Sequence, residues 1–166
     1  MDSIAFRPIG IIHSPHKRSE EIPIQPVYAG GIQGRAELFP EYADGLQDLN
    51  GFSHVYLIYH FHKTTTSRLI VTPFLDDSPR GVFATRAPCR PNAIGLSLVR
   101  LLRIEGCTLH VEDIDILDDT PLLDIKPYVA RFDSRADARC GWTEEVDEAT
   151  ASKRGLRQHG RACGDA

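Results

Sequence analysis

A loop rich in arginine and proline comes directly before a long apolar run, in residues 81–99, GVFATRAPCRPNAIGLSLV. Arg86 and Arg90 are fixed cations, and Pro88 and Pro91 restrict the backbone around them. A guanidinium binds a carboxylate or a phosphate through two parallel hydrogen bonds, and a stiff loop loses little freedom on binding. The pattern therefore indicates a site for a small charged ligand. An ordinary surface loop with solvated arginines is the alternative.

A second stretch, residues 116–128, reads ILDDTPLLDIKPY. Asp118, Asp119 and Thr120 precede Pro121, which is the order expected of a tight turn. Such a turn exposes backbone amides and carbonyls that could bind the edge of an adenine. The alternative for the same residues is an ordinary hairpin turn that binds no ligand.

Histidine and cysteine offer further chemistry. His60 and His62 lie two residues apart and could bind a metal, but no carboxylate or cysteine cluster at a metal-ligand spacing accompanies them. We therefore expect no metal site. Cys89 lies beside the arginines, where a lowered thiol pKa is conceivable. No His and Asn or Asp arrangement surrounds it in the sequence, so a small filler residue is the favoured interpretation.

The composition is that of one globular domain: 166 residues, 42% hydrophobic and 25% charged. The mild net charge of -4 does not indicate global attraction to nucleic acid, so we expect any such contact to be local. No apolar run approaches the roughly 20 residues that span a membrane, and the first residues show no secretory leader. None of the four cysteines belongs to a C-x-x-C pair. We expect a cytoplasmic protein.

The elements that must position these residues are mostly short strands between Gly and Pro turns, which predicts a mostly β domain. Strands are expected at 4–12 (an edge or bulged strand, because of Pro8), 35–39, 54–62, 68–74, 80–85, 96–106, 108–117 and 119–129, and a short helix at 40–50. In 54–62, Val55, Leu57, Tyr59 and Phe61 share one face. In 108–117 the alternation slips near Glu112, and a β-bulge would keep both apolar pairs on the core side.

The chain divides into a β domain, residues 1–134, and a polar tail, residues 135–166. Glu144 and Glu145 early and Lys153 and Arg154 late predict a helix over 144–154, because these charges match the helix dipole. We expect the last ten or so residues to be disordered.

Five motifs in order, PIGIIHSPHK, IPIQP, LNGFSHVYLIYHFHK, GVFATRAPCRPNAIGLSLV and DILDDTPLLDIKPYV, resemble the TsaA-like domain of the TrmO family over about residues 5–133. The resemblance implies a small β-barrel with one or two short helices, S-adenosyl-L-methionine as cofactor, and a homodimer. The implied activity is methylation of the exocyclic amine of threonylcarbamoyladenosine beside the anticodon of a tRNA.

Carried over by motif, the resemblance places the cofactor against four segments, with these residues: Pro23, Ile24, Gln25, Phe61, His62, Lys63, Arg86, Leu96, Asp119, Thr120, Pro121 and Leu122. A guanidinium such as that of Arg86 suits the carboxylate of the cofactor. The turn suits the adenine, and aromatic faces or carbonyl oxygens suit the sulfonium.

The sequence departs from the family pattern at two positions and at its C-terminus. Asp119 stands where Gly is usual, and Asp tolerates a positive φ better than most residues. Ala93 replaces a proline, and only a short tail follows the domain. A methyltransferase for a small molecule or another RNA, and a non-catalytic cofactor-binding module, therefore remain alternatives.

Two residues have possible roles beyond cofactor binding. Asp118, next to the cofactor turn, is a candidate acceptor for the proton of the amine, although an Asp here ordinarily caps the turn. Arg90 is a candidate contact to RNA phosphate or to the cofactor, in a stretch, residues 80–103, that holds five arginines and no carboxylate.

Overall fold

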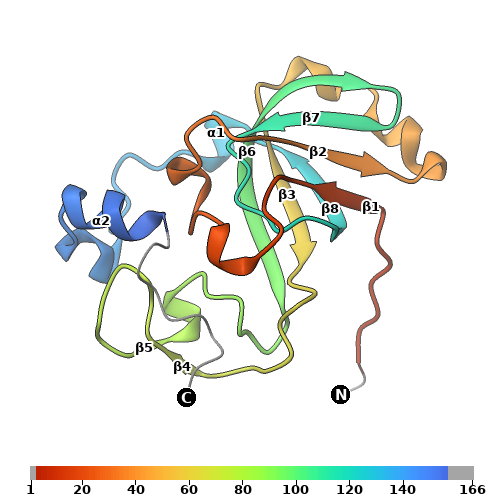
Figure 1. Ribbon diagram of the computed structural model, residues 1–166. Coiled ribbons are helices and arrows are strands. Elements are labelled where there is room, and N and C mark those ends of the chain that lie inside the picture. The colour runs from red at the N-terminus through yellow and green to blue at the C-terminus, as the bar shows by residue number, and fades with distance from the viewer. Residues whose placement is uncertain (1–2, 157–166) are drawn as a thin grey trace.

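Six antiparallel strands form a closed barrel in the order β1-β2-β7-β6-β3-β8, so the predicted small β-barrel is confirmed (Figure 1). The structure, a computed structural model, describes residues 3–156. The barrel strands are β1 (Gly10–His13), β2 (Gln33–Leu38), β3 (His54–His60), β6 (Ile94–Glu105), β7 (Thr108–Glu112) and β8 (Thr120–Pro127). The two short strands β4 (Ile70–Val71) and β5 (Arg80–Gly81) form a separate sheet, below the barrel in Figure 1.

The helices are short. They are η1 (Ser19–Glu21), η2 (Pro26–Tyr28), η3 (Pro40–Leu46), η4 (Leu49–Gly51), η5 (Val82–Ala84), η6 (Gly141–Glu145), α1 (Ala130–Asp133) and α2 (Glu148–Gly155). The helix predicted at 40–50 is present as the two 3-10 helices η3 and η4. The helix predicted at 144–154 starts later, as α2, because the carboxylate of Asp147 caps it by accepting a bond from Thr150 N. Within residues 3–156, no helix has the length and apolar character needed to cross a membrane.

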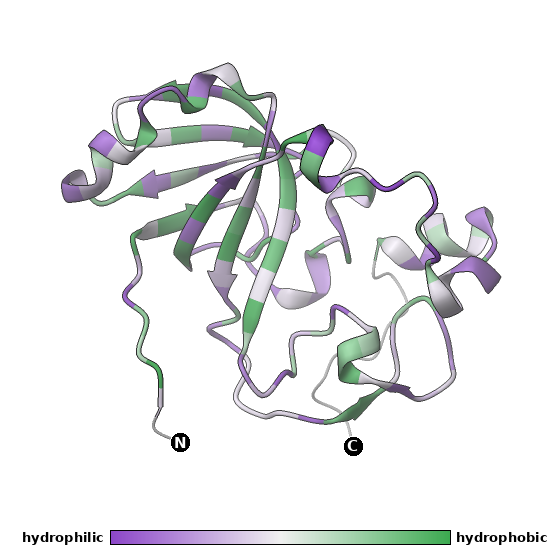
Figure 2. Ribbon diagram, turned by 180° about the vertical axis from the view of Figure 1, so that it is seen from behind, coloured by the Kyte–Doolittle hydropathy of each residue, from purple (hydrophilic) through white to green (hydrophobic). Residues whose placement is uncertain are grey.

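The inward face of β3 follows the predicted alternation. Val55, Leu57 and Tyr59 are buried, with exposed fractions of 0%, 0% and 5%. The strand ends at His60, so Phe61 and His62 lie beyond it rather than on its two faces. Figure 2 shows the same alternation of apolar and polar residues along the barrel strands.

β3 and β6 pair from His54 opposite Arg100 to His60 opposite Ile94. Gly95 lies opposite Tyr59, and a Cβ at Gly95 would collide with the Tyr59 ring. The glycine therefore lets the ring lie across the barrel wall. There the Tyr59 hydroxyl bonds Ser97 Oγ at 3.1 Å, and Ser97 Oγ donates to Asp115 Oδ1 at 2.5 Å.

The segment between β7 and β8 corrects one sequence prediction. Ile114 and Ile116 are buried, with exposed fractions of 0% and 1%, so their assignment to the core is confirmed. The predicted β-bulge is wrong, because β7 ends at Glu112 and Asp113 takes a positive φ of 65° that turns the chain out of the strand. Residues 113–119 then cross the end of the barrel without strand pairing.

Residues after β1 anchor this crossing. Ser14 Oγ donates to Ile116 O at 2.6 Å, and His16 Nε2 lies 3.1 Å from Ile114 O. Ser14 and His16 are both buried, with exposed fractions of 8% and 5%. Each of these contacts joins residues about a hundred positions apart, so they fix the crossing against the start of the chain.

Three predicted strands are shorter than expected. The 4–12 strand is reduced to β1, and 68–74 and 80–85 contribute only the two residues each of β4 and β5. Proline supplies no N–H donor, and Pro8, Pro73 and Pro79 lie at or beside the lost positions. The domain boundary predicted at residue 134 follows α1, and the predicted disorder of the final residues lies outside the described part.

Asp119 has a φ of 58°, as its position in place of a glycine led us to expect. The left-handed region costs a non-glycine residue about 1–2 kcal/mol. We therefore expect Asp119→Gly to be more stable than Asp119→Ala by about 1 kcal/mol in urea unfolding, after the entropic cost of glycine is subtracted. Both variants lose the same carboxylate, so only the backbone differs. At Asp137, where φ is not positive, the glycine variant should be no more stable than the alanine variant. An equal difference between the two variants at both positions would show that the positive φ of Asp119 is not its cause.

Candidate active site

A cavity of about 240 Å³ opens at the end of the barrel where β3 ends and β8 begins. Its lining combines apolar, hydroxyl and titratable side chains: Ser19, Ile22, Tyr59, Phe61, His62, Lys63, Thr64, Thr65, Thr66, Phe74, Pro88, Asp115, Ile116, Leu117 and Thr120. The crossing segment, the end of β3 and the arginine loop all contribute. Four of the predicted cofactor residues are among them: Phe61, His62, Lys63 and Thr120.

Phe61 forms part of the apolar wall. Its ring packs edge-on against Tyr59, with centroids 5.3 Å apart. Its backbone N–H donates to Ala93 O at 2.8 Å, which continues the pairing of β3 with β6 by one residue. The ring is thereby held at the mouth of the barrel.

His62 is held in one tautomer by its neighbours. Thr120 Oγ1 donates its only hydrogen to Leu117 O at 2.7 Å. The same oxygen lies 3.3 Å from His62 Nδ1, so the hydrogen-bond network assigns the ring proton to Nδ1. Burial lowers the pKa of His62, and the charges of Lys63 and His60 lower it further. The ring is therefore neutral at pH 7, with a lone pair on Nε2.

Gln25 and Arg86 lie beside the cavity and bind each other. Arg86 Nη1 donates to Gln25 Oε1 at 2.6 Å. Neither side chain lines the cavity, but their near neighbours along the chain, Ile22 and Pro88, do. The structure thus brings two predicted segments together at the rim. Pro23 is buried and Ile24 is half-buried on the same segment.

The remaining predicted cofactor residues, which are Leu96 on β6 and Asp119, Pro121 and Leu122 of the turn, do not line the cavity. Leu96 is 46% exposed and lies opposite Ile58, on the outer face of the barrel. Leu122 is buried in the core and Pro121 pairs with Ile11. Asp119 is exposed, and its carboxylate lies 3.2 Å from His13 Nδ1.

Asp118 is held by groups outside the cavity. Its carboxylate accepts a hydrogen bond from Ser14 N at 2.9 Å and contacts the ammonium of Lys17. Burial opposes its charge, but these bonds outweigh burial, and the pKa of Asp118 is lowered. The residue therefore fastens the crossing segment to β1. Its side chain does not line the cavity.

A possible metal-ligand group differs from the histidine pair considered in the sequence. Ligand atoms of His13, Asp118 and Asp119 lie within 4.8 Å of one another. The ammonium of Lys17 already neutralises Asp118 there. His60 and His62 form no such group among residues 3–156.

Arg90 shapes the arginine loop from inside. Its Nη1 lies within hydrogen-bond distance of three backbone carbonyls, Val82 O at 3.2 Å, Thr85 O at 2.8 Å and Ala87 O at 3.4 Å. Its guanidinium also lies 5.8 Å from the centroid of the Phe83 ring. Cys89, between the two arginines, is fully buried. It is disulfide-bonded, so the sequence-based interpretation of Cys89 as a small filler residue is wrong.

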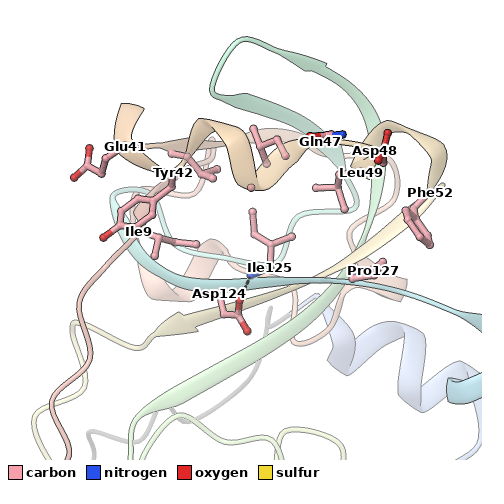
Figure 3. Close-up of a pocket in the computed structure, with 13 residues that line it drawn as sticks. Ile9, Glu41, Tyr42, Gln47, Asp48, Leu49, Phe52, Asp124, Ile125 and Pro127 are labelled. Atoms are coloured by element: carbon pink, nitrogen blue, oxygen red, sulfur yellow. Dashed lines mark hydrogen bonds between the residues drawn. The ribbon is translucent and has the colours of Figure 1, made fainter.

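A larger cavity, of about 520 Å³, lies at the opposite end of the barrel, below η3 and η4 (Figure 3). Apolar side chains such as Ile9, Leu49 and Ile125 frame it, with Glu41, Asp48 and Asp124 among its other lining residues. None of the predicted site residues lines it. Conversely, the sequence reasoning missed Asp115 and Thr64–Thr66 at the first cavity. The three threonines that follow the FHK motif were the available signal.

We expect Asp118→Asn to lower the free energy of unfolding by about 1–2 kcal/mol at pH 7, because the charge-assisted bonds are lost at a partly exposed site. A carboxylate with a lowered pKa stabilises the fold above its unfolded pKa, and this contribution disappears as pH falls through the folded pKa. Wild type and variant should therefore converge in urea titrations well below pH 3.8. Asp137→Asn is the control; a difference that persists in acid would show that the charge is not responsible.

Comparison with known proteins shows which family this chain resembles. The family model described as the tRNA-methyltransferase O N-terminal domain matches residues 11–134. A probable S-adenosyl-L-methionine-binding protein of Pyrococcus abyssi is 54% identical over 142 residues, which are 86% of this chain and 77% of the relative. The tRNA (adenine(37)-N6)-methyltransferase of Escherichia coli is 36% identical over 159 residues, which are 90% of this chain and 68% of that protein.

A solved structure agrees in fold. The crystal structure of TrmO from Pseudomonas aeruginosa matches with a TM-score of 0.72 at 41% sequence identity, over 85% of this chain and 63% of that chain. The present chain thus spans less than two thirds of that solved protein. The family model and the Pyrococcus relative each cover most of the chain, and the chain therefore belongs to the TrmO family through its tRNA-methyltransferase O N-terminal domain.

Proposed function

We propose that this chain methylates the exocyclic amine of threonylcarbamoyladenosine beside the anticodon of a tRNA, with S-adenosyl-L-methionine as methyl donor. Membership of the TrmO family supports the coarser statement, that the chain is an S-adenosyl-L-methionine-dependent tRNA methyltransferase. The observation that supports transfer to an amine is His62, which lies at the wall of a cavity bounded by the arginine loop with Nε2 available to accept a proton; the identity of the nucleoside is proposed from the family resemblance.

The residues around this cavity fit the cofactor. When bound, S-adenosyl-L-methionine supplies an electrophilic methyl group on a sulfonium. The Phe61 ring offers a face to the sulfonium or the adenine, and Thr64–Thr66 and Thr120 offer hydroxyls. Arg86, held at the rim by Gln25, is the cation for the carboxylate.

Of the two candidate proton acceptors, His62 suits the reaction better than Asp118. The nitrogen of the modified adenine is a poor nucleophile, because its lone pair is delocalised. As the N–C bond to the methyl forms and the S–C bond breaks, the nitrogen must release its proton. His62 Nε2 can take that proton, since its other nitrogen is already hydrogen-bonded to Thr120. Asp118 is bound by Lys17 and Ser14 instead.

An RNA surface beside the cavity is supported by local charge. Arg68, Arg86 and Arg90 have no carboxylate within ion-pair distance among residues 3–156. Phe83 is 75% exposed and its ring lies beside the guanidinium of Arg90, and an exposed aromatic ring near a cation can stack on an unpaired base. The anticodon loop presents such bases, so this surface, including Arg90, is our proposed RNA contact despite the net negative chain.

A homodimer would complete the site. Leu96 belongs to the implied cofactor set, yet it lies on the outer face of the barrel with Ile94, 46% and 38% exposed. A second copy covering this face would bury both and bring Leu96 to a shared site. Light scattering at micromolar concentration should give twice the mass of the chain; a monomer would defeat this part of the proposal.

The direct test is transfer of labelled methyl groups to bulk tRNA, followed by digestion and nucleoside analysis. We expect label in N-methylated threonylcarbamoyladenosine. Label in a metabolite extract or in another nucleoside would favour a different substrate. Tight cofactor binding with no transfer to any substrate would favour a binding module without activity.

Removal of the Arg86 guanidinium should weaken S-adenosyl-L-methionine binding by about 1.5–3 kcal/mol, because a charge-assisted hydrogen bond is lost. Isothermal calorimetry on Arg86→Ala measures this change. Arg103→Ala, which removes a guanidinium paired with Glu105 on the far part of β6, should bind as wild type. Unchanged affinity of Arg86→Ala would remove Arg86 from the site.

The pH dependence of transfer should report His62. Because its pKa lies below the ordinary 6.5, the rate at saturating cofactor and tRNA should stay level from pH 8 to about pH 6.5 and fall only below that, as the base becomes protonated. His62→Gln should lower kcat by about 10²–10⁴-fold and abolish this acid limb. The control is His60→Gln at the exposed His60, which should keep kcat and the acid limb and move that limb only slightly to higher pH, because the charge of His60 lowers the pKa of His62. An unaltered acid limb in His62→Gln would exclude His62 as the base.

A further inference from the structure

We propose that the segment after the barrel positions the arginine loop and the IPIQP segment for cofactor binding. This segment, residues 140–155 with η6 and α2, is named the C-terminal strap. It lies beyond the 11–134 matched by the family domain. In Figure 1, α2 lies beside the loop that carries β4 and β5, away from the barrel strands. The proposal rests on the cofactor site proposed above.

The first attachment is at the arginine loop. Trp142 Nε1 donates to Ala84 O at 2.8 Å, two residues before Arg86. The guanidinium of Arg80 lies 5.4 Å from the centroid of the Trp142 ring, and Arg80 is itself paired with Asp76 at 2.5 Å. The indole is therefore fixed at its N–H and on its face by two parts of the same loop.

The second attachment joins α2 to the loop between β4 and β5. Arg154 donates two bonds to the carboxylate of Asp77, Nη1 to Oδ1 at 3.1 Å and Nη2 to Oδ2 at 2.9 Å. A paired fork of this kind fixes orientation as well as distance. Asp77 is exposed, so this pair adds geometric definition rather than much stability.

The third attachment reaches the other side of the cavity. Gly155 O, at the end of α2, accepts a hydrogen bond from Ile24 N at 2.9 Å, within the IPIQP segment. Gly155 is buried, and a Cβ built on it would lie 2.5 Å from Cγ of Tyr28. Only glycine lets the helix end approach the η2 turn this closely.

These attachments place one short segment against both rims of the cavity. The direct link between the rims is the Arg86–Gln25 bond, and the strap holds Ala84 and Ile24 on either side of it. Every paired barrel strand lies within residues 10–127. Loss of a strap contact should therefore loosen the cofactor site and leave the barrel paired.

The experiment uses the full chain with Trp142→Phe, which removes the N–H donor and part of the ring that faces Arg80, and Gly155→Ala, which forces the helix end from Tyr28. We expect the Kd for S-adenosyl-L-methionine to rise about 5–30-fold in each, on the scale of one lost hydrogen bond or one steric clash. Arg154→Ala should have a smaller effect. Lys153→Ala, the neighbouring exposed cation, is the matched control and should bind as wild type.

Hydrogen exchange in the ligand-free protein tests the inference without the cofactor. The amides of Ile24 and of residues 80–86 should exchange faster in Trp142→Phe and Gly155→Ala, and those of β3 and β6 should not change. Wild-type affinity and wild-type exchange in both variants would overturn the strap. Failure of the wild type to bind S-adenosyl-L-methionine would instead defeat the proposed function, and the exchange result would still decide on the strap. Faster exchange throughout the barrel would show a general stability role and also overturn the proposal.

Discussion

The crossing of residues 113–119 over the barrel end is the constraint on which the site depends. Two left-handed aspartates, Asp113 and Asp119, turn the chain out of β7 and into β8. Between them, Ile114 and Ile116 fill the barrel end, so the crossing is fixed by burial as well as by its bonds to Ser14 and His16. The same backbone supplies Leu117 O, which orients the Thr120 hydroxyl and through it the His62 ring. Residues 113–119 thus both fill the end of the core and set which nitrogen of the His62 ring carries the proton.

Much of the barrel could be predicted from residue pattern, because strands with one buried face repeat every second residue. The alternation of Val55, Leu57 and Tyr59 is such a case, and the buried isoleucines after β7 were identified by the same rule. The bulge was predicted in place of a turn because a slip in alternation marks an irregularity without revealing its backbone angle. Aspartate, as at position 113, is one of the few residue types that adopt a left-handed conformation readily. The presence of an aspartate in a sequence does not by itself predict that conformation.

The site was only partly predictable for a different reason. Motif resemblance gave residues near the cavity, and Phe61, His62, Lys63 and Thr120 do line it. Resemblance does not distinguish a side chain that faces a ligand from one that holds the backbone, as Leu122 in the core and Asp118 beside Lys17 show. Contacts between distant segments, such as Trp142 with Ala84, follow no periodic pattern, and only the folded arrangement reveals them.

His60 and Ile94 face each other at the last pair of β3 and β6, and this pairing has a consequence for how the molecule can vary. Residues 61–93 leave the barrel and return to it at one point, so their two ends are already closed by sheet hydrogen bonds. The entropic cost of such an excursion grows only by about 0.6 kcal/mol for each doubling of its length. Insertions and deletions in this lobe are therefore thermodynamically cheap for the barrel. Because the lobe carries the arginine loop and Thr64–Thr66, the range of molecules that the cavity accepts can change while the strand register stays as it is.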